Sequence, residues 1–177
     1  MTNTLRDNIV TIISKYPLAK KEPFSKHPLA SFIRHDFPVE LRALVEGHSR
    51  YKIDGSAGQG QWTNCPWVAT FDILITETAQ SGYYPVYLFR EDMQGVFLSL
   101  NQGVTNLMAK YKSDARNVLQ VRAADFRAQI GVTPESFPLT KIDLATVSKS
   151  DIASYYEAGN IYAIYYSADN LPPNDKL

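Results

Sequence analysis

Apolar residues at the start of the chain lie three and four positions apart, which is the spacing of one face of a helix. These residues are Leu5, Ile9, Ile12, Ile13 and Tyr16. They predict an amphipathic helix over residues 3–16, which Pro17 is expected to end. A second, short helix is expected over residues 29–35. Asp36 has the side chain of a helix N-cap, so a third helix is expected from there to Gly47.

Short apolar runs separated by turn residues occupy the middle of the chain and predict strands. The runs cover residues 51–54, 66–71, 83–89 and 96–100. The strongest run contains Pro85, and a proline inside a strand favours an edge position or a bulge. Because the last two runs are joined by a short turn, they are expected to pair as a hairpin. The middle of the chain therefore predicts a curved, antiparallel or mixed sheet.

Helical spacing returns after Gly103. Helices are expected over residues 104–111 and 113–130, followed by a short strand at 141–144 and a helix from about Asp151. The buried stripe of the long helix is expected at Ala115, Leu119, Phe126 and Ile130. Another face of this helix carries Arg116, Gln120 and Arg127. A solvated polar face is the first interpretation of these three residues.

The order of these elements indicates the α+β class, with a central sheet flanked by helices. The length of 177 residues fits a single domain over residues 1–177. Its last stretch, residues 168–177, has the composition of a linker or tail. The hydrophobic content of 45% and the charged content of 20% are those of an ordinary globular fold.

Composition and charge narrow the classes of protein that the chain can represent. No apolar run approaches the roughly 20 residues of a membrane helix, and no signal-peptide pattern is present, so we expect a cytoplasmic protein without a membrane partner. The single cysteine, Cys65, excludes an internal disulfide and a multi-cysteine zinc site. The formal net charge is zero, although residues 1–50 carry eight Lys and Arg against five Asp and Glu. Such a balance permits a basic patch but does not by itself indicate nucleic-acid binding.

The sequence shows no recognisable catalytic or metal motif. Residues 55–60 form a small-residue loop with three glycines, yet they match neither a phosphate-binding nor a dinucleotide-binding motif. Cys65 precedes an apolar strand and is interpreted as a core residue rather than a nucleophile. The three histidines, His27, His35 and His48, lack metal-ligand spacing. We therefore expect a binding module without catalytic residues, metal or cofactor.

Two segments carry a resemblance to a known family. They are Gly58-Gln-Gly-Gln-Trp-Thr-Asn-Cys-Pro-Trp-Val-Ala69 and Gly82-Tyr-Tyr-Pro-Val-Tyr-Leu88, with supporting matches at residues 21–24, 27–30, 98–103 and 159–162. Together they resemble the N-terminal DNA-binding domain of McrB, a family also written MrcB-like, which belongs to modification-dependent restriction systems. The resemblance implies a reader of double-stranded DNA that flips a methylated cytosine out of the duplex. It also implies a nuclease or GTPase motor in another domain or a partner subunit.

The resemblance also implies a set of site residues. Trp67, Tyr84 and Leu88 match the family's base pocket. Gly58, Gly60 and Gln61 match the loop that approaches the DNA. The basic residues Lys20, Lys21, Arg116 and Arg127 are expected to contact phosphates, while a solvated connector is the alternative for residues 20–28.

Gln59 departs from the family, which can place a tyrosine between the two loop glycines. Either Trp62 supplies the missing aromatic face, or the Gln59 amide hydrogen-bonds the edge of the base. A different modified base, such as hydroxymethylcytosine or an N-methylated base, is therefore an open alternative. A module that binds a small ligand or a protein in the same pocket is another, and an enzyme built on Cys65 or His27 is a third.

Overall fold

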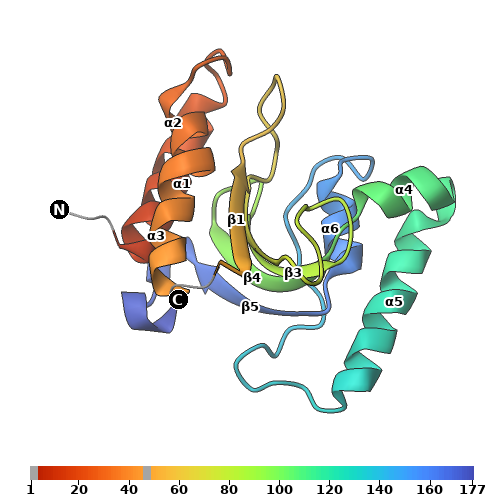
Figure 1. The fold of residues 1–177 in the computed structure, drawn as a ribbon. Helices are drawn as coiled ribbons and strands as arrows, with labels where there is room; N and C mark the ends of the chain where they lie inside the picture. The colour runs from red at the N-terminus through yellow and green to blue at the C-terminus, as the bar shows by residue number, and fades with distance from the viewer. Residues whose placement is uncertain (1–3, 46–48) are drawn as a thin grey trace.

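A five-stranded antiparallel sheet forms the centre of the computed structural model, which describes residues 4–45 and 49–177 (Figure 1). The strands follow one another in sequence order across the sheet. They are β1 (Tyr51–Ser56), β2 (Trp67–Asp72), β3 (Tyr83–Phe89), β4 (Gly95–Gln102) and β5 (Tyr162–Ser167). Every pairing of these strands is antiparallel, which confirms the α+β class and decides between an antiparallel and a mixed sheet in favour of the antiparallel one.

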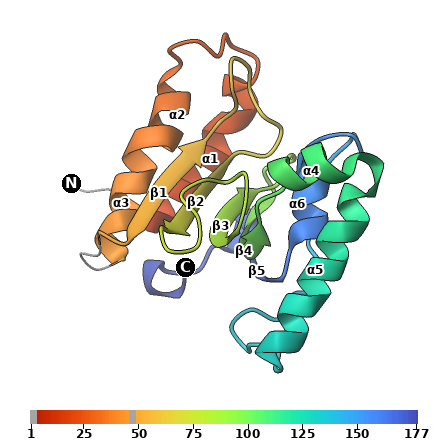
Figure 2. The same ribbon diagram turned by 45° about the vertical axis from the view of Figure 1, so that its right-hand side comes forward.

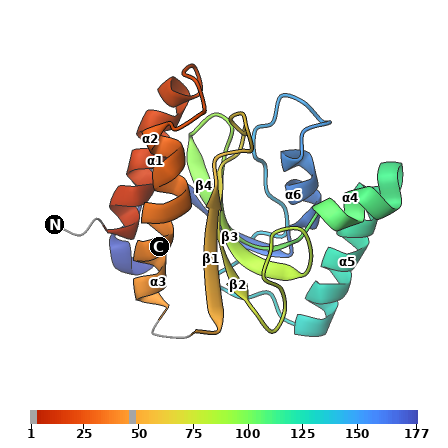
Figure 3. The same ribbon diagram turned by 45° about the horizontal axis from the view of Figure 1, so that its top comes forward.

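Three helical segments from the start of the chain cover one face of the sheet (Figure 3). They are α1 (Leu5–Ala19), α2 (Pro28–Ser31) and α3 (Phe37–Leu44), with a π-helical turn, Phe32–Asp36, between the last two. Successive side chains of each strand point to opposite faces of the sheet, so every second residue faces these helices. The covered face presents Ile53, Val68, Tyr87, Phe89, Val96 and Tyr166 to the helices.

Two predicted helix boundaries in this layer are wrong. Pro17 lies inside α1, which continues to Ala19 because Tyr16 and Ala19 are buried in the core and hold the last turn in place. Asp36 has a helical backbone and caps nothing, because the chain passes from the π-helical turn into α3 without leaving the helical region. The expected end of this helix at Gly47 lies outside the described residues.

Pro85 lies in the central strand of the sheet, so the prediction of an edge strand is wrong. The position is nevertheless locally an edge. Pairing between β2 and β3 runs from Trp67↔Leu88 to Ala69↔Val86 and stops there, so Pro85 is paired only with Leu100 of β4. The missing N–H of proline therefore costs no hydrogen bond toward β2.

The second half of the chain covers the other face of the sheet with α4 (Thr105–Tyr111), α5 (Ala115–Ile130) and α6 (Ala153–Gly159) (Figure 2). The buried stripe of α5 is Ala115, Leu119 and Ala123, so the prediction of a buried Ile130 is wrong: Ile130 is 43% exposed. The helix ends at Gly131 in the left-handed conformation, and in its last turn Arg127 donates to the carbonyls of Asn160 and Ile161 while Ile130 faces solvent.

Residues 141–144 form no strand, contrary to expectation. Ile142 and Leu144 are both buried while Lys141 and Asp143 are exposed, and this alternation imitates a strand in the sequence. Ile142 and Leu144 pack against side chains of the sheet, and the backbone of the segment pairs with the sheet just before them, through an isolated bridge between Leu139 and Ala163.

The expected tail over residues 168–177 includes two short 3-10 turns, Ala168–Asn170 and Asn174–Lys176. Leu171, between them, is buried in the core beside the N-terminal helices. No helix in the described parts of the chain is long and apolar enough to cross a membrane.

Candidate nucleic-acid interface

The loop between β1 and β2 rises from one end of the sheet and depends on glycine at two positions (Figure 1). Gly58 has φ +121°, and a Cβ there would lie 2.0 Å from the Gln61 carbonyl oxygen. Gly60 has φ +70° with open space where a Cβ would stand. The turn therefore favours glycine at both positions. It leaves Gln59, Gly60 and Gln61 exposed at its tip, where a ligand can approach the backbone closely.

The base of this loop is fixed to the N-terminal helical layer. The Tyr16 hydroxyl donates to the Thr63 carbonyl at 2.8 Å, and burial raises the pKa of Tyr16, so this donor keeps its proton. Arg34 donates to the Gly58 carbonyl at 2.6 Å. An exposed tip on a fixed base is an arrangement that loses little conformational entropy when a ligand binds.

Trp62 belongs to this fixed base. Its indole N–H donates to the Glu22 carbonyl at 2.9 Å. Its ring meets those of Tyr16, Phe24 and His27 edge to face, with centroids 4.9–5.3 Å apart. The ring is thus held toward α1 and α2, although it also lines the open groove described below.

The three residues expected to form a base pocket lie together. Tyr84 and Leu88 are four positions apart on β3 and share one face of the sheet, and Trp67 lies opposite Leu88 on β2. Val86, Asn101 and Tyr156 complete the lining of the cavity between them. The space that the centre of a water molecule can reach is only about 10 Å³, enough for about one water-sized group. A whole base does not fit this cavity as it stands.

Tyr84 is held rigidly in the wall of this aromatic cavity. Its hydroxyl donates to the Ala79 carbonyl at 2.9 Å. Its ring meets the Phe71 ring edge to face, with the ring centroids 4.8 Å apart. Burial raises the pKa of Tyr84, so the hydroxyl stays protonated at neutral pH.

Tyr156 is not among the predicted pocket residues. It comes from α6, far along the chain, and burial raises its pKa to about 12 despite a lowering by hydrogen bonding with the Trp67 side chain. The only sequence signal for it is the tyrosine-rich run that begins at Tyr155, and such a run favours core packing. Asn101 fixes this part of α6, since its side-chain amide donates to the Tyr156 carbonyl at 2.9 Å.

An open groove of about 800 Å³ lies above the aromatic cavity. Its walls are the glycine loop, the segment at residues 77–80 and the start of α6. Trp67 and Tyr156 line both spaces, so they form the floor of the groove and a wall of the cavity. The charged residues that line the groove are Lys52, Asp54, Glu77 and Asp151. One lysine against three carboxylates gives this groove a negative balance.

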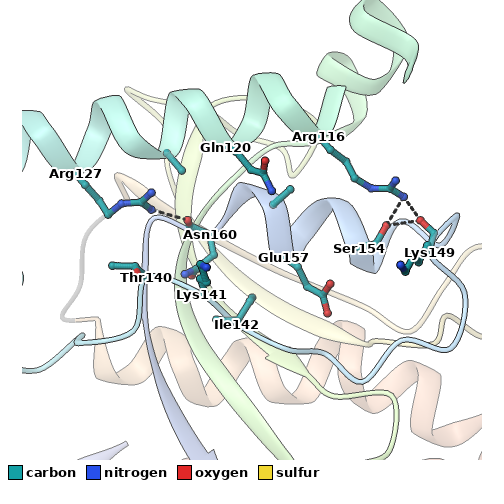
Figure 4. A pocket seen from close by; sticks show the side chains of 12 residues that line it. Arg116, Gln120, Arg127, Thr140, Lys141, Ile142, Lys149, Ser154, Glu157 and Asn160 are labelled. Atoms are coloured by element: carbon teal, nitrogen blue, oxygen red, sulfur yellow. Dashed lines mark hydrogen bonds between the residues drawn. The ribbon is translucent and has the colours of Figure 1, made fainter. Parts of the chain in front are cut away.

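The four expected phosphate contacts are not brought together. Lys20 donates from its Nζ to Asn64 Oδ1 at 2.7 Å, at the foot of the glycine loop, while Lys21 is exposed in the turn after α1. Arg116 and Arg127 lie on α5 and line a separate hollow between α5 and α6 (Figure 4).

Within residues 4–45 and 49–177, no group of three His, Cys, Asp or Glu side chains is arranged to hold a metal ion. His48 lies outside these residues. Cys65 is buried, and burial raises the pKa of its thiol, so it has the core position expected from the sequence. Its thiol is in the protonated, unreactive form at neutral pH.

Comparison with known protein families gives one match. The family described as MrcB-like, N-terminal domain matches residues 11–177, which include every strand and much of α1. No curated protein matches the chain. The family indicates a binding domain rather than an enzyme. The chain therefore belongs to the MrcB-like N-terminal domain family, which indicates a DNA-binding module of a restriction system.

Proposed function

We propose that this domain recognises a modified cytosine in double-stranded DNA and flips the base into the groove above the aromatic cavity. One observation carries the proposal. Trp67 and Tyr156 present aromatic side chains to an open groove, and behind them lies a small cavity with the apolar side chains of Val86 and Leu88.

The size of the cavity assigns different parts of the base to the two spaces. The base ring stacks on Trp67 and Tyr156 in the groove, and the 5-methyl group enters the cavity, where the centre of a water-sized group has about 10 Å³ of space, enough for one group of that size. Burying a methyl group contributes about 0.8 kcal/mol, and stacking a base on an aromatic side chain about 1–3 kcal/mol. These terms together offset an extrusion cost of a few kcal/mol.

The exposed tip of the glycine loop contacts the DNA beside the flipped base. Gly58 and Gly60 allow the backbone to come close, and Gln59 and Gln61 supply side-chain amides with donors and acceptors. Because Trp62 is held by the N-terminal helices, we assign the hydrogen-bonding role to Gln59 and an anchoring role to Trp62.

The domain acts together with a nuclease or a GTP-driven motor, in another domain or in a partner subunit, and it does so in the cytoplasm. The family supports the proposal of an effector, since a binding domain of a restriction system needs a partner activity that cuts or translocates DNA. The 1–177 unit itself contributes recognition, and the segment at 168–177 is the proposed connection to the effector.

A binding panel tests the proposal. Fluorescence anisotropy would compare duplexes that differ at one cytosine: unmodified, 5-methyl and 5-hydroxymethyl. A fluorescent base analogue next to that position would report extrusion. Tightest binding to the 5-methyl duplex, with increased fluorescence, is expected. Equal affinity for all three duplexes would refute the proposal, and preference for the hydroxymethyl duplex would assign the site to another modified base.

A further inference from the structure

A second hollow, of about 660 Å³, lies between α5, α6 and the segment from Thr140 to Lys149 (Figure 4). It lies behind α6 as seen from the groove. The groove is lined by Ile152 and Tyr156 of this part of the chain, whereas the hollow is lined by Ser154 and Glu157. One helix, about 10 Å across, thus separates the two spaces.

Positive charge dominates this hollow. Its charged residues are Arg116, Arg127, Lys141, Lys149 and Glu157. Four cations therefore surround one carboxylate, in a chain whose formal net charge is zero. The groove has the opposite balance, and its one lysine is already paired with Asp54 at 3.0 Å. A phosphate is attracted to the hollow and not to the groove.

The two arginines are fixed before any ligand arrives. Arg116 donates to the Ser154 hydroxyl at 2.8 Å and to the Lys149 carbonyl, and it lies 4.5 Å from the centre of the Tyr155 ring. At the other end of the hollow, Arg127 donates to the carbonyls of Asn160 and Ile161 at 3.2 and 3.1 Å. A guanidinium group has five N–H donors, so each arginine keeps donors for a ligand while its side chain is held in place.

We propose that the hollow between α5 and α6 is a phosphate site that binds the backbone of one DNA strand, separately from the groove that takes the base. Arg116 with Lys149 holds one end of the bound stretch and Arg127 with Lys141 the other. The same arginines brace both ends of α6, so the phosphate site and Tyr156 are positioned by one short helix. This inference rests on the proposed function only in taking DNA as the ligand.

The length of the site favours a strand over a single phosphate. Arg116 and Arg127 are eleven positions apart on one face of α5, which is about 16 Å at 1.5 Å per residue. Successive phosphates of a DNA strand advance about 3.4 Å along the helix axis, so two groups about 16 Å apart meet different phosphates of the same strand. A mononucleotide is too short to reach both ends.

The salt dependence of binding to an unmodified duplex tests this site without involving the base pocket. Lys141 and Lys149 are exposed and their side chains do not brace α6, so the double variant Lys141→Gln/Lys149→Gln is expected to fold normally. The slope of log Kobs against log salt should become less steep by about 1.8, about 0.9 for each lost phosphate contact. The loss should be equal for modified and unmodified duplexes. Glu157→Gln should act oppositely and tighten binding to both.

A matched control is the double variant Lys110→Gln/Arg122→Gln, which removes the same charge from α4 and from another face of α5. It should leave the slope nearly unchanged. An equal change of slope in both double variants would overturn the site, since it would show only the effect of net charge. An unchanged slope in the first variant would also overturn it.

A separate experiment distinguishes free phosphate from the DNA backbone as the ligand of this site. Inorganic phosphate and dCMP, each at millimolar concentration, would be titrated while the backbone amides of α5 and α6 are followed by NMR. Weak, non-saturating shifts are expected. Saturable binding of either probe that is lost in Lys141→Gln/Lys149→Gln, with no change in duplex binding, would overturn the assignment to DNA. If the parent protein shows no preference for the 5-methylcytosine duplex, the base pocket is refuted, but the salt slope of Lys141→Gln/Lys149→Gln still tests the phosphate site. Failure of the proposed function and failure of this site are therefore distinguishable.

Discussion

Trp67 and Tyr156 line the same aromatic cavity and the same open groove, although one comes from β2 and the other from α6. They are the only pair within residues 4–45 and 49–177 that borders both spaces. Any base that enters the groove meets these two side chains before it reaches the cavity behind them. The relationship gives the proposed base pocket two walls that the chain brings together only through the tertiary fold.

Replacing either wall should abolish discrimination between duplexes. Trp67→Ala and Tyr156→Ala each remove a stacking surface worth about 1–3 kcal/mol, so affinity for the 5-methyl duplex should fall roughly 5- to 150-fold. Affinity for the unmodified duplex should change little. Fluorescence anisotropy with both duplexes measures the ratio.

Two further variants show whether the aromatic face itself is responsible. Tyr156→Phe keeps the ring and should keep the preference for the 5-methyl duplex. Tyr111→Ala removes an exposed tyrosine of α4, whose ring lies 5.0 Å from the Lys110 ammonium, and should have no effect on the preference. A Trp67→Ala protein that still prefers the methylated duplex would contradict the assignment.

The glycines of the loop give a second prediction. Gly60 and Gly131 both have positive φ, +70° and +82°, and apart from the glycine and its two chain neighbours no heavy atom lies within 4 Å of the position that a Cβ would take at either residue. Alanine at either position should lower the free energy of unfolding by about 1 kcal/mol, because L-residues disfavour this conformation. Only Gly60→Ala should also weaken DNA binding, since Gly131 follows α5 and lies away from the groove.

Urea unfolding and duplex binding would be measured for both variants. Equal loss of stability with unequal loss of binding is the expected result. If Gly131→Ala weakens binding as much as Gly60→Ala does, the loop tip makes no special contact with DNA. Gly58→Ala is a stronger perturbation, because its Cβ would lie 2.0 Å from the Gln61 carbonyl oxygen and the whole turn would have to move.

The parts of this fold that follow from local spacing were predictable, and the parts that follow from tertiary packing were not. The alternation of Tyr84, Val86 and Leu88 on β3 places these side chains on one face, as a strand requires. The predictions at Pro17 and Ile130 are wrong, because Tyr16 and Ala19 are buried in the core around Pro17 whereas Ile130 is exposed at the end of α5.

The candidate site divides in the same way. Trp67, Tyr84 and Leu88 belong to neighbouring strands, so their proximity follows from the hairpins and from the family resemblance. Tyr156 reaches the cavity only because α6 packs over the sheet, and no local signal encodes that contact. Trp62 is close to the pocket in the sequence, yet its ring is held by Tyr16, Phe24 and His27 from α1 and the following loop.

Lys20 and Lys21 should behave differently, although they are adjacent. Lys21 is exposed, so Lys21→Gln should reduce the salt slope by about 0.9, the value for one lost phosphate contact. Lys20 donates to Asn64, whose Nδ2 in turn donates to Asp151 at 2.5 Å, across the groove from the loop to the start of α6. Lys20→Gln should therefore loosen the loop and lower the preference for the methylated duplex. If the salt slope falls equally in Lys20→Gln and Lys21→Gln, both lysines contact phosphates and the role assigned to Lys20 is wrong.

Glu157 should make stability depend on pH in the direction opposite to most carboxylates. Burial raises its pKa above 4.5, and Asp143 raises it further, while the hydrogen bond that it accepts from the Leu144 N–H and the charge of Arg116 partly oppose this shift. The folded chain therefore holds this proton more tightly than the unfolded chain. The contribution of Glu157 to stability is greatest below about pH 4.5 and is lost as the pH rises through the folded pKa.

Glu157→Gln isolates this contribution, because the glutamine carbonyl still accepts from Leu144 at the position of Oε1. The difference in free energy of unfolding between variant and parent should grow in favour of the variant from about pH 4 to pH 7. The lowered pKa values of Asp7, Asp72 and Asp92 cancel in that difference, since both proteins contain them. Glu135→Gln, at an exposed position, serves as the control. A difference that stays flat across this range would show that folding leaves the pKa of Glu157 unshifted, so that burial of this carboxylate has no cost.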